Sequence, residues 1–316
     1  MRPILVAGAT GLLGSEICRL LCGSRHLVRG LVRAGSPREE TLHDHGVEIV
    51  PGDLRDIHSL EAACRDVTTV ISTVSGLSRR LPGDSLKSVG RDGQRALVEA
   101  ARHAGVRRFI FVSASPNLPR TIPLVRYKRE TEALIRASGM AWIIVQPAVF
   151  METWFTRRAG FDVSSGKAAL LGAGEAPVSY VSVRDVAKAV AGVVDAEPEV
   201  THTFLPLGGP EPLAPLDAIR IFEEESGRRY TLLRGPTSLA RGMSLLLRPF
   251  DPGLSSTLSL AAYLADHGDF VESPEPVWDW IQRPVTFRDF ARSAVRAALT
   301  ERVRLLLLRG MGGSRL

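Results

Sequence analysis

Three glycines at regular spacing are the feature that most constrains how this chain can fold. Gly8, Gly11 and Gly14 stand between the apolar run at residues 4–7 and a helical pattern that starts at Ser15. A strand that turns into a helix leaves the first N–H groups of the helix unpaired, and the helix dipole adds positive potential there. The first glycine permits the tight turn, the second lets phosphates approach the backbone, and the third lets the helix lie close to the strand. The spacing predicts a turn that binds the pyrophosphate of a dinucleotide, and a glycine-rich turn without a ligand is the alternative.

Composition restricts the class of protein. With 316 residues, 45% of them hydrophobic, the chain can bury a large core as one domain or as a domain with a smaller lobe. We see no long apolar run and no leader before the first strand, so we expect a cytoplasmic location. The net charge is +6, but the basic residues are scattered, so we predict no nucleic-acid partner. The cysteines and histidines show neither a disulfide framework nor ligand spacing, so we predict no metal.

The first half of the chain alternates between strand and helix patterns. Helices are expected over residues 86–104 and 124–138, and each stops before a glycine. Short apolar, β-branched runs predict strands at residues 4–7, 27–32, 47–50, 69–73, 108–113 and 142–146. This order predicts an α/β fold, a doubly wound parallel Rossmann sheet with a smaller C-terminal substrate lobe.

The regular alternation of strand and helix patterns ends after Phe150. We expect a glycine-rich loop at residues 166–174, strands at 178–181, 203–207 and 230–233, and helices from Ser182 or Arg184 and over 215–226. We therefore predict a dinucleotide-binding domain over residues 1–155 and a smaller substrate-binding lobe over residues 156–316, interleaved with the last sheet strands. Substrate would bind between the lobe and the carboxyl ends of the strands.

The segment after the second strand favours a phosphorylated dinucleotide. An NAD site places an acidic residue here to bind the ribose 2′-hydroxyl, but this chain has Arg33, Ser36 and Arg38. A guanidinium matches phosphate oxygens, whereas a carboxylate repels them. We therefore predict NADP(H), with NAD(H) as the alternative cofactor and with arginines that only coat a loop as the alternative interpretation.

Two later strand ends complete the predicted cofactor site. Asp53, followed by Leu54, could accept a hydrogen bond from the adenine amino group, and a turn-forming aspartate is the alternative. The small-residue loop at 72–76, with Thr73 and Val74, would let the second ribose and phosphate lie against the backbone.

Several motifs occur together along the chain. They are Gly8-Ala9-Thr10-Gly11-Leu12-Leu13-Gly14, Leu31-Val32-Arg33, Gly52-Asp53-Leu54, Val112-Ser113-Ala114-Ser115, Lys128 and Gln146-Pro147-Ala148-Val149-Phe150-Met151-Glu152. Together they resemble the NmrA-like family of atypical short-chain dehydrogenases/reductases. The resemblance is strongest over residues 1–155, persists through residues 180–187 and fades after about residue 235.

The resemblance implies a Rossmann fold and a site for NADP(H) or NAD(H). Family members include reductases of quinones, phenylpropanoids and related small molecules, and also catalytically silent redox sensors and assembly factors. The implied cofactor-binding residues are Gly8, Thr10, Gly11, Leu12, Leu13 and Gly14 in the turn, Leu54, Lys128, and Pro147 and Val149 in a loop over the nicotinamide.

The chain departs from the wider superfamily at the proton donor. A tyrosine normally stands four residues before the active-site lysine, but here the position holds Leu124, which carries no proton. Tyr127 is adjacent to Lys128, so it points about 100° away on a helix. By resemblance, Lys128 binds the nicotinamide ribose or acts as general acid or base, and a surface lysine is the alternative. By resemblance, Ser113 and Ser115 lie where the superfamily has its substrate-orienting hydroxyl, and serines that only end a strand are the alternative.

The remaining features leave alternatives open. Trp154, Phe155 and Phe161 could form a substrate wall or belong to the core. After an apolar run at 245–247, a helix from Phe287 carries leucines at 305–308 among many arginines. It would pack on its own domain or across a homodimer interface, with a membrane-surface role as the minority interpretation.

The sequence thus predicts an NADPH-dependent oxidoreductase. Its substrate would be a small apolar or aromatic carbonyl, enone or quinone, reduced by hydride transfer, with Lys128 and Ser113 as catalytic residues. A non-catalytic NADP(H)-binding redox sensor is the alternative.

Overall fold

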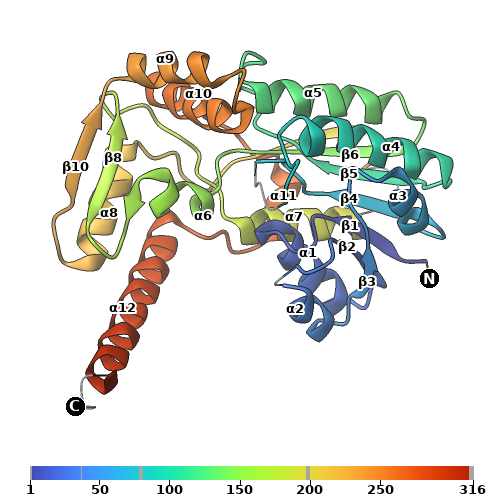
Figure 1. Cartoon of the computed structure of the whole chain (residues 1–316), viewed down its shortest axis with the longest axis horizontal. Helices are drawn as coiled ribbons and strands as arrows, with labels where there is room; N and C mark the ends of the chain where they lie inside the picture. The colour runs from blue at the N-terminus through green and yellow to red at the C-terminus, as the bar shows by residue number, and fades with distance from the viewer. Residues whose placement is uncertain (1, 37, 78–80, 197–199, 313–316) are drawn as a thin grey trace.

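A parallel sheet forms the centre of the computed structural model, which describes residues 2–36, 38–77, 81–196 and 200–312, with side chains through residue 301 (Figure 1). Within these residues the strand order is β3-β2-β1-β4-β5-β6-β9, and every pairing is parallel. The order reverses beside β1, which confirms the predicted doubly wound Rossmann sheet. The strands are β1 (Ile4–Ala7), β2 (Val28–Val32), β3 (Glu48–Pro51), β4 (Thr69–Ser72), β5 (Arg108–Val112), β6 (Ala141–Pro147) and β9 (Thr203–Leu207).

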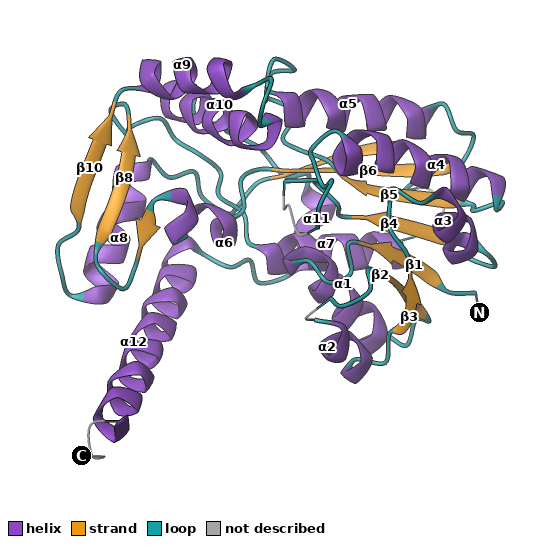
Figure 2. Cartoon of the chain, in the orientation of Figure 1, coloured by secondary structure: helices purple, strands orange, loops and turns teal. Residues whose placement is uncertain are grey.

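Helices cover both faces of this sheet (Figure 2). Alternate residues of β1 point to opposite sides, so Leu5 and Ala7 join one apolar cluster while Ile4 and Val6 join the other. The first cluster lies under α3 (Ile57–Cys64), α4 (Gln94–His103) and α5 (Pro123–Arg136). The second lies under α1 (Leu12–Gly23), α2 (Glu39–Asp44), α7 (Val183–Asp195) and α11 (Glu275–Ile281).

A smaller group of elements stands beside one end of the sheet (Figure 1). Its own sheet has the order β10-β8-β7, with β10 parallel and β7 antiparallel to β8. The elements are α6 (Met151–Trp154), η2 (Arg157–Ala159), β7 (Phe161–Asp162), β8 (Lys167–Leu171), α8 (Pro215–Ser226), β10 (Thr231–Gly235), α9 (Thr237–Leu247), α10 (Pro252–His267) and α12 (Phe287–Gly312). The predicted leucines at 305–308 belong to α12, but their side chains lie outside the described part.

Aromatic side chains fill the core of this smaller group. Phe155 contacts Phe161, Tyr180 and Phe287 with ring centroids 4.8–5.1 Å apart, and Phe222 packs beside them. Phe155 and Phe161 are buried, and Trp154 packs partly against the same cluster. Core packing therefore describes Phe155 and Phe161, while Trp154 is only partly buried.

Three predicted elements differ from the structure. Residues 167–171 form β8 instead of a loop. Gly166 and Gly172 adopt positive φ just before and just after this strand, so they mark its two ends and do not interrupt it. Residues 178–181 make only isolated bridges, because their N–H groups bond to scattered partners and Tyr180 N–H turns back to the Val178 carbonyl. The helix expected from residue 86 begins with a π-helical segment, η1 (Ser88–Gly93), and only then continues as α4.

No helix among the described residues has both the length and the apolar character needed to span a membrane.

Candidate functional site

The glycine turn connects β1 to α1 at the carboxyl edge of the sheet. Gly8 adopts φ +87°, and a Cβ there would lie 2.6 Å from Thr73 Oγ1. A Cβ on Gly14 would lie 2.1 Å from the Gly8 carbonyl oxygen, so only glycine lets α1 approach the strand end this closely. Gly11 is the N-cap of α1 and provides no side-chain cap, which leaves the amides of Leu12 and Leu13 open to an anion.

The predicted 2′-phosphate residues have different surroundings. Arg33 Nη1 lies 2.8 Å from Oδ2 of Asp84, whose side chain is buried, so the Arg33 charge is already paired. Arg38 Nη1 donates to the carbonyl of Thr10 at 3.4 Å, which places Arg38 against the glycine turn. Ser36 Oγ is buried without a hydrogen-bond partner among the described residues. Ser36 and Arg38 are therefore better placed than Arg33 to receive a phosphate.

Asp53 forms a turn as well as an ion pair. Its Oδ1 accepts from the backbone N–H of Arg55 at 2.9 Å, and its Oδ2 lies 2.7 Å from Arg55 Nη2. The Arg55 guanidinium holds the pKa of this carboxyl below its usual range. Both oxygens are thus engaged by Arg55, and the adenine contact of Asp53 stays a prediction. Leu54 beside it is buried.

The loop after β4 joins the glycine turn to α5. Thr73 Oγ1 donates to the carbonyl of Ala7 at 3.2 Å. The carbonyl of Val74 accepts from Gln94 Nε2 at 2.9 Å and from Lys128 Nζ at 3.1 Å. These bonds hold the predicted phosphate loop and the predicted active-site lysine in one rigid unit.

Lys128 projects from α5 into the gap between the ends of β4 and β5. Its side chain is only 5% exposed, and its Nζ also donates to the carbonyl of Val112 at 2.6 Å and lies 4.5 Å from the centroid of the Phe111 ring. Burial lowers the pKa of Lys128 to about 7, while the charge of Glu132 opposes this shift. The surface-lysine alternative is therefore wrong. An amine with a pKa near neutrality at this edge of the sheet can exchange a proton with a ligand.

Ser113 belongs to a buried polar cluster that the sequence did not reveal. Its Oγ donates to Oε1 of Glu132, which also accepts from Arg129 and, at 3.2 Å, from Gln146 Nε2. Arg129 further donates to the carbonyl of Ser115 at 2.6 Å. Glu132 stands four residues after Lys128 on α5, and Arg129 stands three residues before Glu132; these two helical spacings are the signal that could have found them.

Asp269 is the second residue that sequence reasoning missed. Its Oδ1 accepts from Ser115 Oγ at 2.7 Å and from Asn117 Nδ2 at 3.0 Å, although the chain separates Ser115 from Asp269 by 154 residues. Its Oδ2 is buried with no hydrogen-bond partner among the described residues, and burial raises the pKa of this carboxyl. Only the folded chain brings these residues together, so no local pattern marks Asp269.

Leu124, at the position of the missing tyrosine, and the nearby Tyr127 both make other contacts. Leu124 packs partly against the aromatic core, and its backbone N–H donates to Ser256 Oγ at 3.1 Å. The Tyr127 ring lies 5.4 Å from the Arg91 guanidinium and 5.0 Å from that of Arg126.

The loop predicted to cover the nicotinamide follows β6. Pro147 ends β6 and is paired with Leu207 of β9, and the carbonyl of the buried Val149 accepts from the N–H of Val181 at 3.0 Å. This loop therefore lies where the sheet meets the smaller group of elements.

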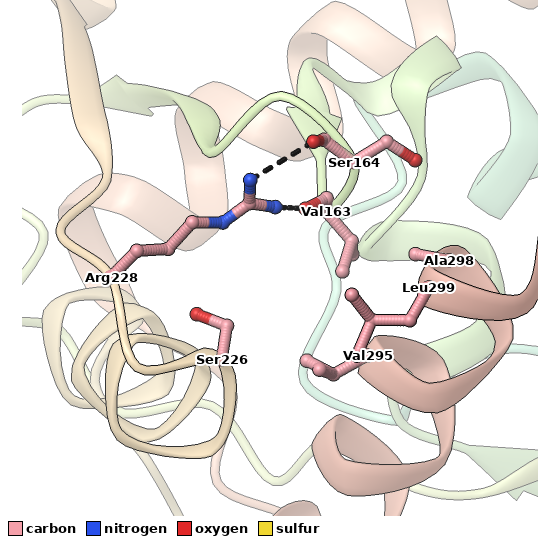
Figure 3. A pocket seen from close by; sticks show the side chains of 7 residues that line it. All are labelled: Val163, Ser164, Ser226, Arg228, Val295, Ala298 and Leu299. Carbon is pink, nitrogen blue, oxygen red and sulfur yellow. Dashed lines mark hydrogen bonds between the residues drawn. The ribbon is translucent and has the colours of Figure 1, made fainter. Parts of the chain in front are cut away.

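A cavity of about 150 Å³ lies elsewhere, between the β7–β8 turn, α8 and α12 (Figure 3). The guanidinium of Arg228 spans it and donates to the carbonyls of Val163 and Ser164. None of the predicted site residues lines this cavity. Over the described residues, no group of three or more His, Cys, Asp or Glu side chains is arranged to hold a metal ion.

Comparison with solved structures shows the fold. The chain is similar to the triphenylmethane reductase of Citrobacter sp. complexed with NADP(H), with a TM-score of 0.73 and 21% identity, covering 93% of this chain and 99% of that one. It is also similar to the NADPH-dependent quinone oxidoreductase QOR2 of Escherichia coli complexed with NADPH, with a TM-score of 0.72 and 19% identity, covering 92% and 99% of the two chains.

Sequence comparison shows the family. The chain is 31% identical over 235 residues to the NAD(P)H azoreductase of Xenophilus azovorans, covering 73% of this chain and 77% of that protein. It is 28% identical over 274 residues to the photosystem II assembly factor Ycf39 of Trieres chinensis, covering 85% and 84%. The family model described as NmrA-like family matches residues 2–276, and the chain belongs to the NmrA-like family, as the resemblance implied.

Proposed function

We propose that this protein is an NADPH-dependent reductase that transfers hydride to a small apolar or aromatic carbonyl, enone or quinone. The observation that carries the proposal is the buried Lys128 amine between the ends of β4 and β5, bonded to the carbonyl of Val74, whose side chain lies against Gly8 of the glycine turn. The names of an azoreductase relative and of two reductases with the same fold support the reaction class.

The residues present fit a phosphorylated dinucleotide. The α1 amides lack a side-chain cap, Ser36 Oγ lacks a partner among the described residues, and Arg38 lies against Thr10. The pyrophosphate would bind over the turn, and Ser36, Arg38 and Arg33 would hold the 2′-phosphate, with NAD(H) as the alternative cofactor. Residues 1–155 would bind the cofactor, and residues 156–316 would bind the substrate. The proposed cofactor-binding residues are Gly8, Thr10, Gly11, Leu12, Leu13, Gly14, Arg33, Ser36, Asp53, Leu54, Thr73, Val74, Lys128, Pro147 and Val149.

The residues of the chain itself would supply the proton that the reduction requires. A bound reduced nicotinamide supplies the hydride. Lys128 in its ammonium form would donate the proton to the substrate oxygen, directly or through a water, and its pKa near 7 keeps both protonation states populated at neutral pH. Ser113 Oγ donates its hydrogen bond to Glu132 and accepts a long one from Arg129 at 3.4 Å, so its remaining lone pair would accept a hydrogen bond from a water or from the hydroxyl of the reduced product.

NADPH consumption with a panel of quinones, enones and aromatic carbonyls tests the proposal. We expect turnover with at least one class, and we expect Lys128→Ala to stop turnover while NADPH still binds. Turnover that is unchanged in Lys128→Ala would overturn the role of this lysine.

A non-catalytic NADP(H) sensor is the second candidate. Leu124 at the usual tyrosine position and the likeness to an assembly factor favour it. Binding of NADPH and NADP+ with no turnover across the whole panel would support the sensor and contradict the reductase. The cytoplasmic location and a homodimer stay predictions.

A further inference from the structure

Helix α9 has the reverse of the usual amphipathic arrangement. It packs against α10 through the small residues Ala240 and Ser244, which are only 5% and 3% exposed. The Ser244 hydroxyl forms hydrogen bonds with Ser255 of α10. The large apolar side chains of α9 point outward, with Leu246 72% exposed and Phe250 just beyond the helix 80% exposed. A surface helix ordinarily buries its large apolar residues and exposes the small or polar ones. The intramolecular packing of α9 therefore gives no reason for these leucines.

The exposed apolar residues gather on one outer element. We call them the α9 surface, and it lies on the outermost helix at one edge of the molecule, reached from the end of β10 (Figure 1). Contiguous exposed apolar residues on a protein surface mark an interaction site. The α9 surface consists of Leu239, Met243, Leu245, Leu246 and Phe250.

The chain segment that carries the α9 surface is rich in arginine, while Asp251 and Asp266 stand beside it at the two ends of α10. Residues 226–250 contain five arginines and neither aspartate nor glutamate. Arg241 is paired with Asp266, and Arg229 with Glu223. In contrast, Arg234 and Arg248 are exposed and make no ion pair among the described residues.

These two arginines stand at opposite ends of α9. Arg234 lies near the end of β10, three residues before α9 starts, and Arg248 is the C-cap of α9. The exposed apolar helix thus has, at each end, an exposed arginine that makes no ion pair among the described residues. Apolar side chains flanked by arginine are the arrangement that binds the interface of an anionic bilayer.

We propose that the α9 surface docks this protein on an anionic phospholipid bilayer. The leucines and Phe250 enter the headgroup region, and Arg234 and Arg248 contact lipid phosphates. A second copy of the chain is a poorer occupant, because a two-fold contact through antiparallel α9 helices brings Arg234 of one copy toward Arg248 of the other. This surface is separate from α12, on which the sequence-based membrane interpretation rested.

Vesicle flotation of the full chain tests the proposal. The probe is phosphatidylcholine vesicles in which one third of the lipid is phosphatidylglycerol, at low ionic strength, compared with pure phosphatidylcholine. We expect binding to the anionic vesicles that weakens with salt. The variant with Leu245→Ser, Leu246→Ser and Phe250→Ser should bind at least about tenfold more weakly. Arg234→Gln and Arg248→Gln should each weaken binding about fivefold.

Matched controls come from exposed residues outside the α9 surface. Leu27→Ser and Arg107→Gln remove an exposed leucine and an exposed arginine elsewhere, and both should float like the wild type. Circular dichroism verifies that each variant is folded. Wild-type protein that fails to float with anionic vesicles, or a triple variant that floats equally well, overturns the proposal. So does a wild-type dimer, without vesicle binding, that the triple variant converts to a monomer.

Discussion

Replacing Lys128 with methionine should stabilise the fold while it abolishes turnover. Methionine fills similar space but carries no charge, and Lys128 is buried with a pKa near 7 against an ordinary value of 10.5. At pH 7 this shift corresponds to about 4 kcal/mol of destabilisation relative to a neutral side chain. Loss of the bonds to the carbonyls of Val74 and Val112 offsets part of the gain, at about 1 kcal/mol each. The net effect expected for Lys128→Met is a gain of about 1–3 kcal/mol in the free energy of unfolding.

The lowered pKa of Lys128 also determines how the stability of the fold changes with pH. Because the folded pKa of Lys128 is lowered, the unfolded chain binds more protons between about pH 7 and pH 10, and stability rises with pH there. The destabilisation is fully present below pH 7. The stability difference between Lys128→Met and the wild type should therefore shrink as the pH rises from about 7 to 9.

Urea unfolding at several pH values and NADPH-dependent turnover are the assays. A variant that is less stable than the wild type at pH 7, or a stability difference that does not change with pH, would refute the burial argument. A variant that keeps full turnover would refute the catalytic role.

Three further predictions use matched or single changes. Gly14→Ala should weaken NADPH binding at least about tenfold, because the added Cβ would collide with the Gly8 carbonyl oxygen. In the control Gly23→Ala the added Cβ has no neighbouring atom within 4 Å, so this variant should bind NADPH normally in calorimetry. Equal affinities of the two variants would contradict the close approach of α1 to the strand end. Arg38→Ala should lower the ratio of NADPH to NADH affinity about tenfold, and an unchanged ratio in the same titration would remove Arg38 from the 2′-phosphate site. Asp269→Ala should lower the free energy of unfolding by about 1–3 kcal/mol, since it leaves the Ser115 and Asn117 donors unpaired. Asp269→Asn keeps an acceptor oxygen and should lower the free energy of unfolding by less. Urea unfolding in which Asp269→Asn is the less stable variant would contradict this explanation.

The sequence predicted the main sheet well because its signals are local. Strand β1 and helix α8 have the predicted bounds, since an apolar run before a glycine turn and a proline-led helix are each marked by adjacent residues. Strand β8 was missed because Gly166 and Gly172 suggest a loop unless their positive φ values are known. Residues 178–181 have the composition of a strand, yet their hydrogen bonds depend on three distant segments.

Some residues of the candidate site likewise have local sequence signals, whereas others depend on distant parts of the chain. The glycine turn and Lys128 follow from motifs and a family resemblance, but the burial of Lys128 depends on the strand ends around it. Glu132 could have been found from its helical spacing. Asp269 could not, because its link to Ser115 exists only after α10 returns the chain to the sheet.

Calorimetric titration of the wild-type protein with NADPH tests the central claim most directly, because every proposed step requires this nucleotide to bind at the β1–α1 turn. The account predicts one-site binding that Gly14→Ala weakens and Gly23→Ala does not. No heat with NADPH, or binding that Gly14→Ala leaves unchanged, would contradict it.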